Sequence, residues 1–142
     1  MQVFIIGTPL ETAMVLSKRH LNNQINEAKI ILDALNGAKA WSNHPCVLQY
    51  RGYEGWLRAY YGCLDAYASG RKWDAKVYSD LADAICPEWH TQEYYDQMKR
   101  RLYTKNPLYY ALWEYLGVSV ENWYWSQEQG EWRKYVNGKR IE

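Results

Sequence analysis

Apolar and polar residues alternate with a helical period along most of the chain, and capping residues mark where the helices begin and end. In the stretch TPLE, Thr8 stands at an N-cap position, Pro9 at the first helical position, and Glu11 where it completes a capping box. This pattern predicts a short helix over residues 9–17. The preceding residues 2–6 are predicted to form an extended segment.

The same signals predict five further helices, over residues 19–36, 45–70, 73–85, 92–103 and 107–116. Glycines inside the long third helix weaken it, and a break near Gly52 is expected. Thr91 is the expected N-cap of the fifth helix. The C-terminal NWYWSQEQGEWRKYVNGKRIE loses the helical period and alternates rings with polar residues. The predicted fold is therefore an all-α, mostly helical single domain over residues 1–142, with an extended or short-stranded aromatic C-terminal segment.

The composition adds limits on the class of protein. With 142 residues, 48% of them apolar and 23% charged, the chain can bury a core without disulfides. No apolar run reaches the roughly 18 residues of a membrane span, and the start lacks the basic and apolar regions of a signal peptide. A cytoplasmic, monomeric protein is expected.

The cysteines do not predict a redox or metal site. Cys46, Cys63 and Cys86 have no disulfide or CxxC spacing and fit reduced thiols packed as small hydrophobic side chains. A zinc site made of His44, Cys46, Cys86 and His90 would have loose ligand spacing. No metal and no other cofactor is predicted.

Aromatic content is the unusual feature, because eight Trp and 14 Tyr stand against one Phe. Tyr and Trp rings carry a polar O–H or N–H group, so they suit surfaces where one ring edge contacts water and the face stacks on a partner. The alternative is a Tyr/Trp-rich core. The net charge of +1 argues neither for nor against a polyanionic partner, since only clustered charge makes a strong local field.

The second predicted helix carries an uncommon row of polar side chains. At 100° per residue, its apolar stripe consists of Leu21, Ile25, Ala28, Leu32 and Leu35. On one flank of this stripe His20, Gln24, Glu27 and Ile31 form a row, with Asn23 just behind it. A carboxylate at such a boundary is oriented by an imidazole and amides without being neutralised, which suits general acid/base or charge-stabilising chemistry. The alternative is a structural ion pair between Glu27 and Arg51 or Arg19.

The segment HLNNQINEAKIIL resembles the catalytic helix of the pyrimidine-dimer DNA glycosylase superfamily, the phage endonuclease V type and its smaller relatives. The shared elements are His20–Leu21, Gln24 and Glu27. Three further blocks resemble the small relatives in the same order, namely WSNHP at 41–45, RGYE at 51–54 and KNPLYY at 105–110. Together the four blocks span about two-thirds of the chain.

The resemblance implies an all-helical enzyme that kinks damaged duplex DNA, extrudes a nucleotide and attacks the sugar C1′ with its own α-amino group. It assigns Glu27 the essential carboxylate and Met1 the amine, with His20 and Gln24 beside them. An α-amino group has a pKa near 8, so part of it is neutral at pH 7.

This sequence also departs from the phage enzyme. Gln2 follows Met1, and a bulky second residue usually leaves the methionine in place. Asn26 and Ile30 replace basic residues that flank the glutamate, and Val3 or Phe4 replaces one near the N-terminus. These changes weaken the expected phosphate binding.

The predicted DNA contacts come from basic and aromatic residues elsewhere. The stretch MKRRLYTKNP predicts a phosphate-binding patch, for which the alternative is a solvated charged face; it consists of Lys99, Arg100, Arg101 and Lys105. The tail predicts a surface that stacks on bases, for which the alternative is a segment folded over the helices as core; it consists of Trp123, Trp125, Trp132, Arg133 and Lys134. Asn23, His44 and Arg51 complete the predicted contacts, although His44 also suits a helix cap and Arg51 an ion pair with Glu54.

The leading hypothesis is a DNA glycosylase, with AP-lyase activity as a second step, acting on a damaged or modified pyrimidine in double-stranded DNA. One alternative is a non-catalytic module on the same scaffold that binds a nucleotide or nucleic acid. Another is a protein-interaction domain that uses its Tyr/Trp surface.

Overall fold

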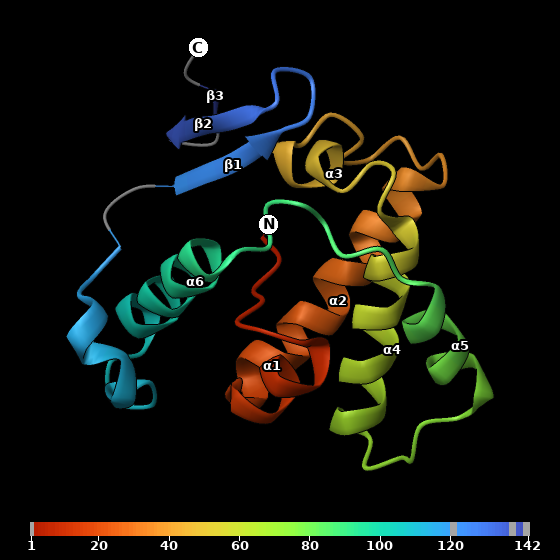
Figure 1. Ribbon diagram of the computed structural model, residues 1–142, viewed down its shortest axis with the longest axis horizontal. Helices are drawn as coiled ribbons and strands as arrows, with labels where there is room; N and C mark the ends of the chain where they lie inside the picture. The colour runs from red at the N-terminus through yellow and green to blue at the C-terminus, as the bar shows by residue number, and fades with distance from the viewer. Residues whose placement is uncertain (1, 120–121, 137–138, 141–142) are drawn as a thin grey trace.

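The computed structural model describes residues 2–119, 122–136 and 139–140, of which residues 122–124, 134–136 and 139–140 are described in their backbone alone. Six α-helices and one 3-10 helix lie in this part of the chain, and a small antiparallel sheet covers one side of them (Figure 1). The predicted helical fold with a short-stranded C-terminal segment is therefore confirmed. No helix in the described residues is long and apolar enough to cross a membrane.

Local capping explains the first two helices. Helix α1 (Pro9–Val15) begins with the predicted capping box, in which the Thr8 hydroxyl accepts from the Glu11 N–H and the Glu11 carboxylate accepts from the Thr8 N–H. Helix α2 (Lys18–Leu35) begins at Ser17, whose hydroxyl accepts from the His20 N–H.

The predicted third helix is two helices. Helix α3 (Pro45–Gln49) and helix α4 (Glu54–Ala68) are separated at the predicted break, where Gly52 has φ = 91°. That left-handed backbone conformation favours glycine, because a Cβ would strain it. Helix α4 packs against α1, α2 and α5 (Ala75–Asp83).

Helix α6 (Gln92–Lys105) begins at the predicted Thr91 cap. It lies on one side of the N-terminal segment, and α2 and α4 lie on the other (Figure 1). The prediction of an α-helix over residues 107–116 is wrong. The chain first turns and then forms the 3-10 helix η1 (Ala111–Leu116). Asn106 caps the end of α6, and its side chain accepts from the Tyr109 N–H within the turn. The turn lets Tyr110 point inward, where it is buried.

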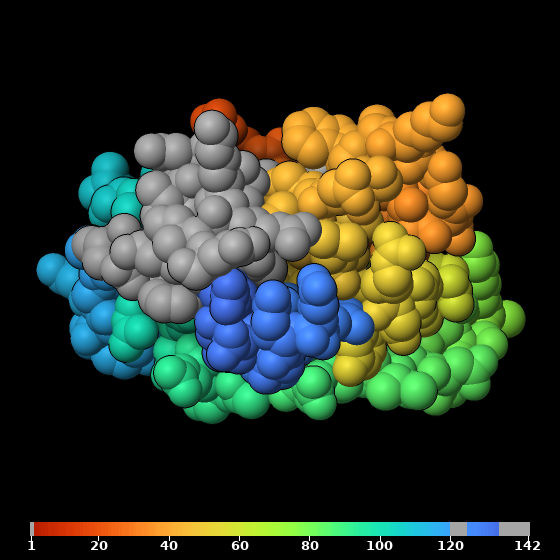
Figure 2. All heavy atoms as spheres, turned by 90° about the horizontal axis from the view of Figure 1, so that it is seen from above, coloured from red at the N-terminus to blue at the C-terminus, as the bar shows by residue number. Residues whose placement is uncertain are grey.

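Strands β1 (Asn122–Ser126), β2 (Glu131–Val136) and β3 (Lys139–Arg140) form an antiparallel sheet in the order β1-β2-β3. The sheet is attached to α3 through Gln49, whose side-chain oxygen accepts from the Trp125 N–H at 3.1 Å. From above, the described blue residues of the β1-β2 hairpin lie against the yellow residues around α3 and the start of α4 (Figure 2).

The N-terminal segment lies in the core although it forms neither helix nor strand. Val3, Phe4 and Ile5 are buried. The Tyr60 hydroxyl of α4 donates to the Phe4 carbonyl at 2.7 Å, and the Tyr94 hydroxyl of α6 donates to the Val3 carbonyl at 3.3 Å. The segment therefore joins the two groups of helices.

This segment also corrects the predicted apolar stripe of α2. Leu21 and Ala28 are buried as predicted, but Ile25, Leu32 and Leu35 are only partly buried. The buried face is rotated toward the polar flank and includes Gln24, Ile31 and Ala34. The reason is that the N-terminal segment packs along this flank and covers it.

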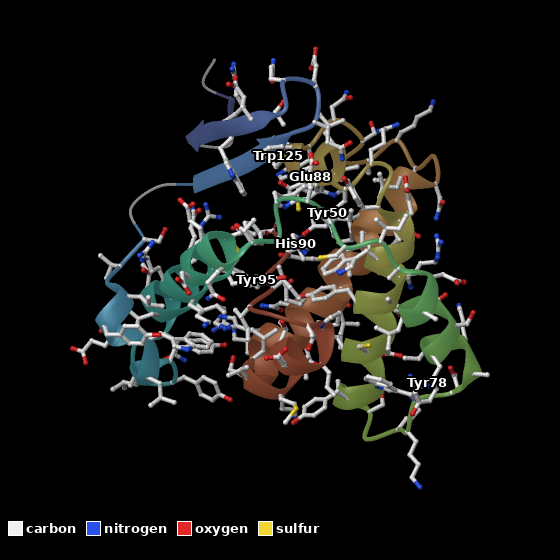
Figure 3. The ribbon with its side chains drawn as sticks, in the orientation of Figure 1. Tyr50, Tyr78, Glu88, His90, Tyr95 and Trp125 are labelled. Carbon is white, nitrogen blue, oxygen red and sulfur yellow. The ribbon has the colours of Figure 1, made fainter. Side chains whose placement is uncertain are left out.

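An aromatic layer fills the space between α4, α6 and the hairpin (Figure 3). At its centre, His90 Nε2 lies 2.9 Å from the Tyr50 hydroxyl, and the His90 ring stacks on Tyr94 with centroids 5.2 Å apart. The His90 and Trp56 rings also lie edge to face, with their centroids 4.6 Å apart. Burial lowers the pKa of His90 to about 3, so its imidazole is neutral near pH 7.

Candidate active site

The Glu27 carboxylate is half-buried on α2, directly beside the N-terminal segment. Its Oε2 accepts from the Gln2 backbone N–H at 3.0 Å and from Gln24 Nε2 at 3.2 Å. Among the described residues, no ion pair involves Glu27, so the alternative of an ion pair with Arg19 or Arg51 is wrong. Neutral N–H donors orient this carboxylate.

The hydrogen bonds of Gln24 explain why an amide side chain is buried on α2. It is 2% exposed, and all four of its hydrogen-bonding positions are used. Its oxygen accepts from the Phe4 N–H at 2.8 Å and from the Tyr60 hydroxyl at 2.7 Å. Its NH₂ group donates to the Gln2 carbonyl at 2.8 Å and to Glu27. One side chain thus fixes both the N-terminal segment and the carboxylate.

His20 lies at the other end of the row, in a separate cluster. Its Nδ1 is 2.7 Å from the Tyr110 hydroxyl, which also accepts from the Ser17 N–H at 2.9 Å. The two rings stack with centroids 5.5 Å apart and planes 9° from parallel. Burial, and then the charges of Lys105 and Arg19, lower the pKa of His20, which favours the neutral imidazole.

The structure therefore brings Gln24 and Glu27 together but places His20 apart from them. Seven residues separate His20 from Glu27, which is about 10 Å along a helix. Met1 lies outside the described residues. Asn23 is exposed on the same helix.

His44 is a helix cap, as the alternative interpretation predicted. Its Nδ1 accepts from the Cys46 N–H at 3.1 Å at the start of α3, and burial lowers its pKa. Arg51 is exposed in the turn after α3, and its carbonyl accepts from Gln127 Nε2 at 2.7 Å. Glu54 accepts from the Gly52 N–H at 3.1 Å.

The predicted basic patch on α6 is not a single exposed surface. Arg101 is 6% exposed, so its prediction as a surface phosphate contact is wrong, because it falls on the face of α6 that packs inward. Arg100 Nε donates to the Leu116 carbonyl at 2.7 Å, and Lys99 Nζ lies 3.9 Å from an Asp96 oxygen. Of the four residues, Lys105 is the one that is exposed.

The described rings of the tail pack on the core, so the alternative interpretation is correct for them. Trp125 stacks on Trp89 with centroids 6.2 Å apart, and Trp132 stacks on Tyr94 at 5.6 Å. One face of each ring is therefore covered by the core, and both side chains stay partly exposed. Arg133 pairs with Glu131 at 2.7 Å. The side chains of Trp123 and Lys134 lie outside the described residues.

Within the described residues, no group of three or more His, Cys, Asp or Glu side chains is placed to hold a metal ion. Cys46 and Cys63 are buried thiols, as predicted, whereas Cys86 is exposed. The exposure of Cys86 corrects its prediction as a packed small side chain, because it follows α5 on the surface.

Two residues of the site were missed in the sequence. Tyr60 shares its hydroxyl proton between Phe4 and Gln24, and Tyr110 positions His20. Tyr60 has the helical spacing of a core residue, but that spacing does not indicate which polar group its hydroxyl meets.

One comparison with known proteins found a match. A model of the family described as pyrimidine dimer DNA glycosylase matches residues 1–78. The match includes α1 to α4, and with them Gln24, Glu27 and Tyr60. No curated protein and no solved structure matches the chain.

Proposed function

The chain belongs to the pyrimidine dimer DNA glycosylase family, and on that ground we propose that it excises a damaged or modified pyrimidine from duplex DNA, with Glu27 as its essential carboxylate. The observation that carries this proposal is the 3.0 Å hydrogen bond from the Gln2 N–H to Glu27 Oε2. This hydrogen bond holds the Glu27 carboxylate beside the start of the chain. Among the described residues, the carboxylate has no cationic partner.

We propose Met1 as the nucleophile. Three covalent bonds link the Gln2 amide nitrogen to the α-amino nitrogen of Met1. A neutral α-amine attacks C1′ of the target sugar, and the C1′–base bond breaks with its electron pair leaving on the base. Near pH 7, roughly one-tenth of a group with a pKa near 8 is neutral.

Glu27 then has two roles in this proposal. Its negative charge stabilises the positive charge that develops at C1′ in the transition state. It also accepts a proton from the attacking amine, so that an imine can form and strand scission can follow by elimination. Gln24 positions the carboxylate through its 3.2 Å hydrogen bond.

Borohydride trapping of the untagged protein tests the amine mechanism. The substrates are duplexes that contain an abasic site, ultraviolet damage or a modified base, and mass spectrometry locates any adduct. A reduced adduct on Met1 is the expected result. No adduct on any duplex, with salt-sensitive DNA binding intact, would end the lyase proposal and favour a glycosylase without lyase activity or a binding module.

A matched pair of substitutions tests the carboxylate. Glu27→Gln keeps the size and an acceptor for the Gln2 N–H but removes the charge, and we expect turnover to fall at least about 100-fold while folding and DNA binding persist. Glu54→Gln is the control, since Glu54 also accepts a backbone N–H at 3.1 Å, but from Gly52 at the start of α4. Loss of folding in Glu27→Gln alone would indicate a structural role.

A further inference from the structure

Residues 107–118, here named the apolar lobe, expose an unusual amount of apolar and aromatic surface. The lobe projects at the end of the molecule opposite α5 (Figure 1). Its outward side chains and their exposed fractions are Leu108 93%, Tyr109 55%, Leu112 89%, Tyr115 77% and Val118 60%. Contiguous exposed apolar residues with a polar rim mark interaction surfaces.

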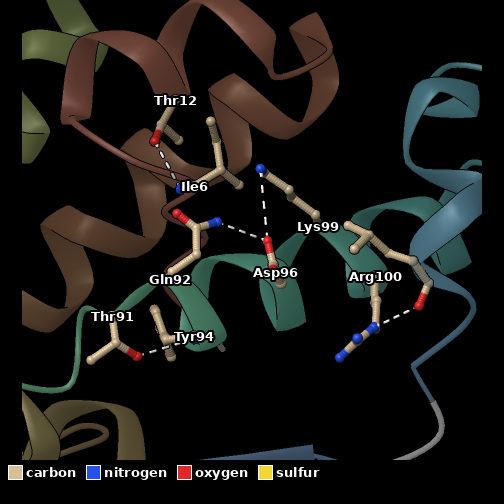
Figure 4. A network of polar contacts seen from close by, with 9 residues as sticks. Ile6, Thr12, Thr91, Gln92, Tyr94, Asp96, Lys99 and Arg100 are labelled. Atoms are coloured by element: carbon tan, nitrogen blue, oxygen red, sulfur yellow. Dashed lines mark hydrogen bonds and ion pairs between the residues drawn. The ribbon is translucent and has the colours of Figure 1, made fainter.

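The lobe is a fixed structure. Its inward ring, Tyr110, stacks on Trp113 with planes 4° from parallel. The Leu116 carbonyl accepts from Arg100 Nε at 2.7 Å (Figure 4), and the Ser119 N–H donates to the Thr104 hydroxyl at 2.9 Å. The exposed leucines are therefore presented on a scaffold anchored to α6.

The lobe is also attached to the helix that carries the candidate carboxylate. Tyr110 contacts both Ser17 and His20 at the start of α2. Glu27 lies about 10 Å further along this helix. That distance is about three base-pair steps of about 3.4 Å. A duplex that lies along α2 over Glu27 would extend to the point where Tyr110 joins the lobe to this helix.

Charge around the lobe favours a polyanionic partner. Lys18 and Arg19 are exposed where Tyr110 meets α2, and Lys105 is exposed at the end of α6. Glu114 is the single acidic residue in the sequence of residues 107–118. A second copy of the chain would present these same cations to one another, whereas DNA phosphates would neutralise them.

We propose that the apolar lobe binds duplex DNA, with Leu108 and Leu112 inserted from the minor groove at a base step beside the target nucleotide. Apolar side chains that enter base steps in this way unstack them and kink the duplex. Tyr109 and Tyr115 add faces on which exposed bases stack. The inference rests on the proposed function for the identity of the partner, and it assigns the lobe the opening of the duplex, separate from the chemistry at Glu27.

The double variant Leu108→Ser/Leu112→Ser tests the proposal without risk to the core, because both side chains are almost fully exposed. Ile85→Ser is the matched control, since Ile85 is 72% exposed just beyond α5, at the other end of the molecule. The probe is a duplex with an abasic-site analogue next to 2-aminopurine, whose fluorescence rises when it unstacks. Affinity is measured by fluorescence anisotropy and self-association by sedimentation.

We expect the double variant to bind this duplex about tenfold more weakly, or about 1.4 kcal/mol, and to lose the fluorescence rise, while Ile85→Ser keeps both. Unchanged binding and unstacking in the double variant would overturn the inference, even with Glu27→Gln inactive and the proposed function intact. Conversely, lobe-dependent binding without excision would sustain the inference and reject the catalytic proposal. A wild-type dimer that the double variant dissociates, with DNA binding unchanged, would assign the lobe to a second copy of the chain.

Discussion

Replacing Gln24 with leucine should release the N-terminal segment from the rest of the fold. The substitution keeps the side-chain size but leaves the Phe4 N–H and the Gln2 carbonyl without their partners at 2.8 Å. A buried polar group that loses its hydrogen bond costs about 1–3 kcal/mol, so two such groups predict a loss of about 2–6 kcal/mol in the free energy of unfolding. For a domain of this size, each kcal/mol lowers Tm by about 4 °C.

The assay is urea unfolding followed by tryptophan fluorescence, with a thermal melt as the second measurement. Asn23→Leu is the control, because it removes a neighbouring amide that is exposed, and it should change the free energy of unfolding by less than about 0.5 kcal/mol. If Gln24→Leu is as stable as this control, the four hydrogen bonds of Gln24 do not hold the segment, and the explanation of the buried amide fails.

Two further predictions concern the other buried polar groups. Burial lowers the pKa of His90 from 6.5 to about 3. Between these pH values the unfolded chain therefore binds more protons than the folded chain. The free energy of unfolding should fall by about 2 kcal/mol from pH 7 to pH 5. In urea unfolding at each pH, His90→Phe should remove most of this slope, whereas the cap-retaining His44→Asn should remove only the smaller part that comes from the lowered pKa of His44; an unchanged slope in His90→Phe would refute the assignment. Tyr110→Phe leaves the Ser17 N–H without its 2.9 Å acceptor and should cost about 1–2 kcal/mol, while the same change at the exposed Tyr109 should cost less than about 0.5 kcal/mol. Equal stabilities of the two tyrosine variants in a thermal melt would contradict that cost.

Helix starts could be predicted because their determinants are local. The caps at Thr8 and Thr91 depend on hydrogen bonds between residues three positions apart, so the sequence contains both partners side by side. The Gln24–Glu27 contact has the same spacing and could be expected for the same reason.

The missed features depend on distant partners. The buried face of α2 is rotated because residues 2–4 dock on it from twenty or more positions away. Helical periodicity places Arg101 among charged neighbours but does not indicate which face of α6 packs inward. The stacking of Trp132 on Tyr94 joins residues 38 positions apart, so an alternating aromatic tail looks the same whether it covers a core or faces DNA.

The docking of the first residues has a consequence for how the protein is made. The Val3 carbonyl accepts from Tyr94, 91 positions later, and the Gln2 side chain reaches Met98, 96 positions later. At about 5–20 residues per second, several seconds of translation separate the appearance of the segment from that of α6. The residues beside Glu27 thus leave the ribosome well before the helix against which they pack. A nascent chain would complete the packing beside the proposed catalytic carboxylate only after α6 has been synthesised.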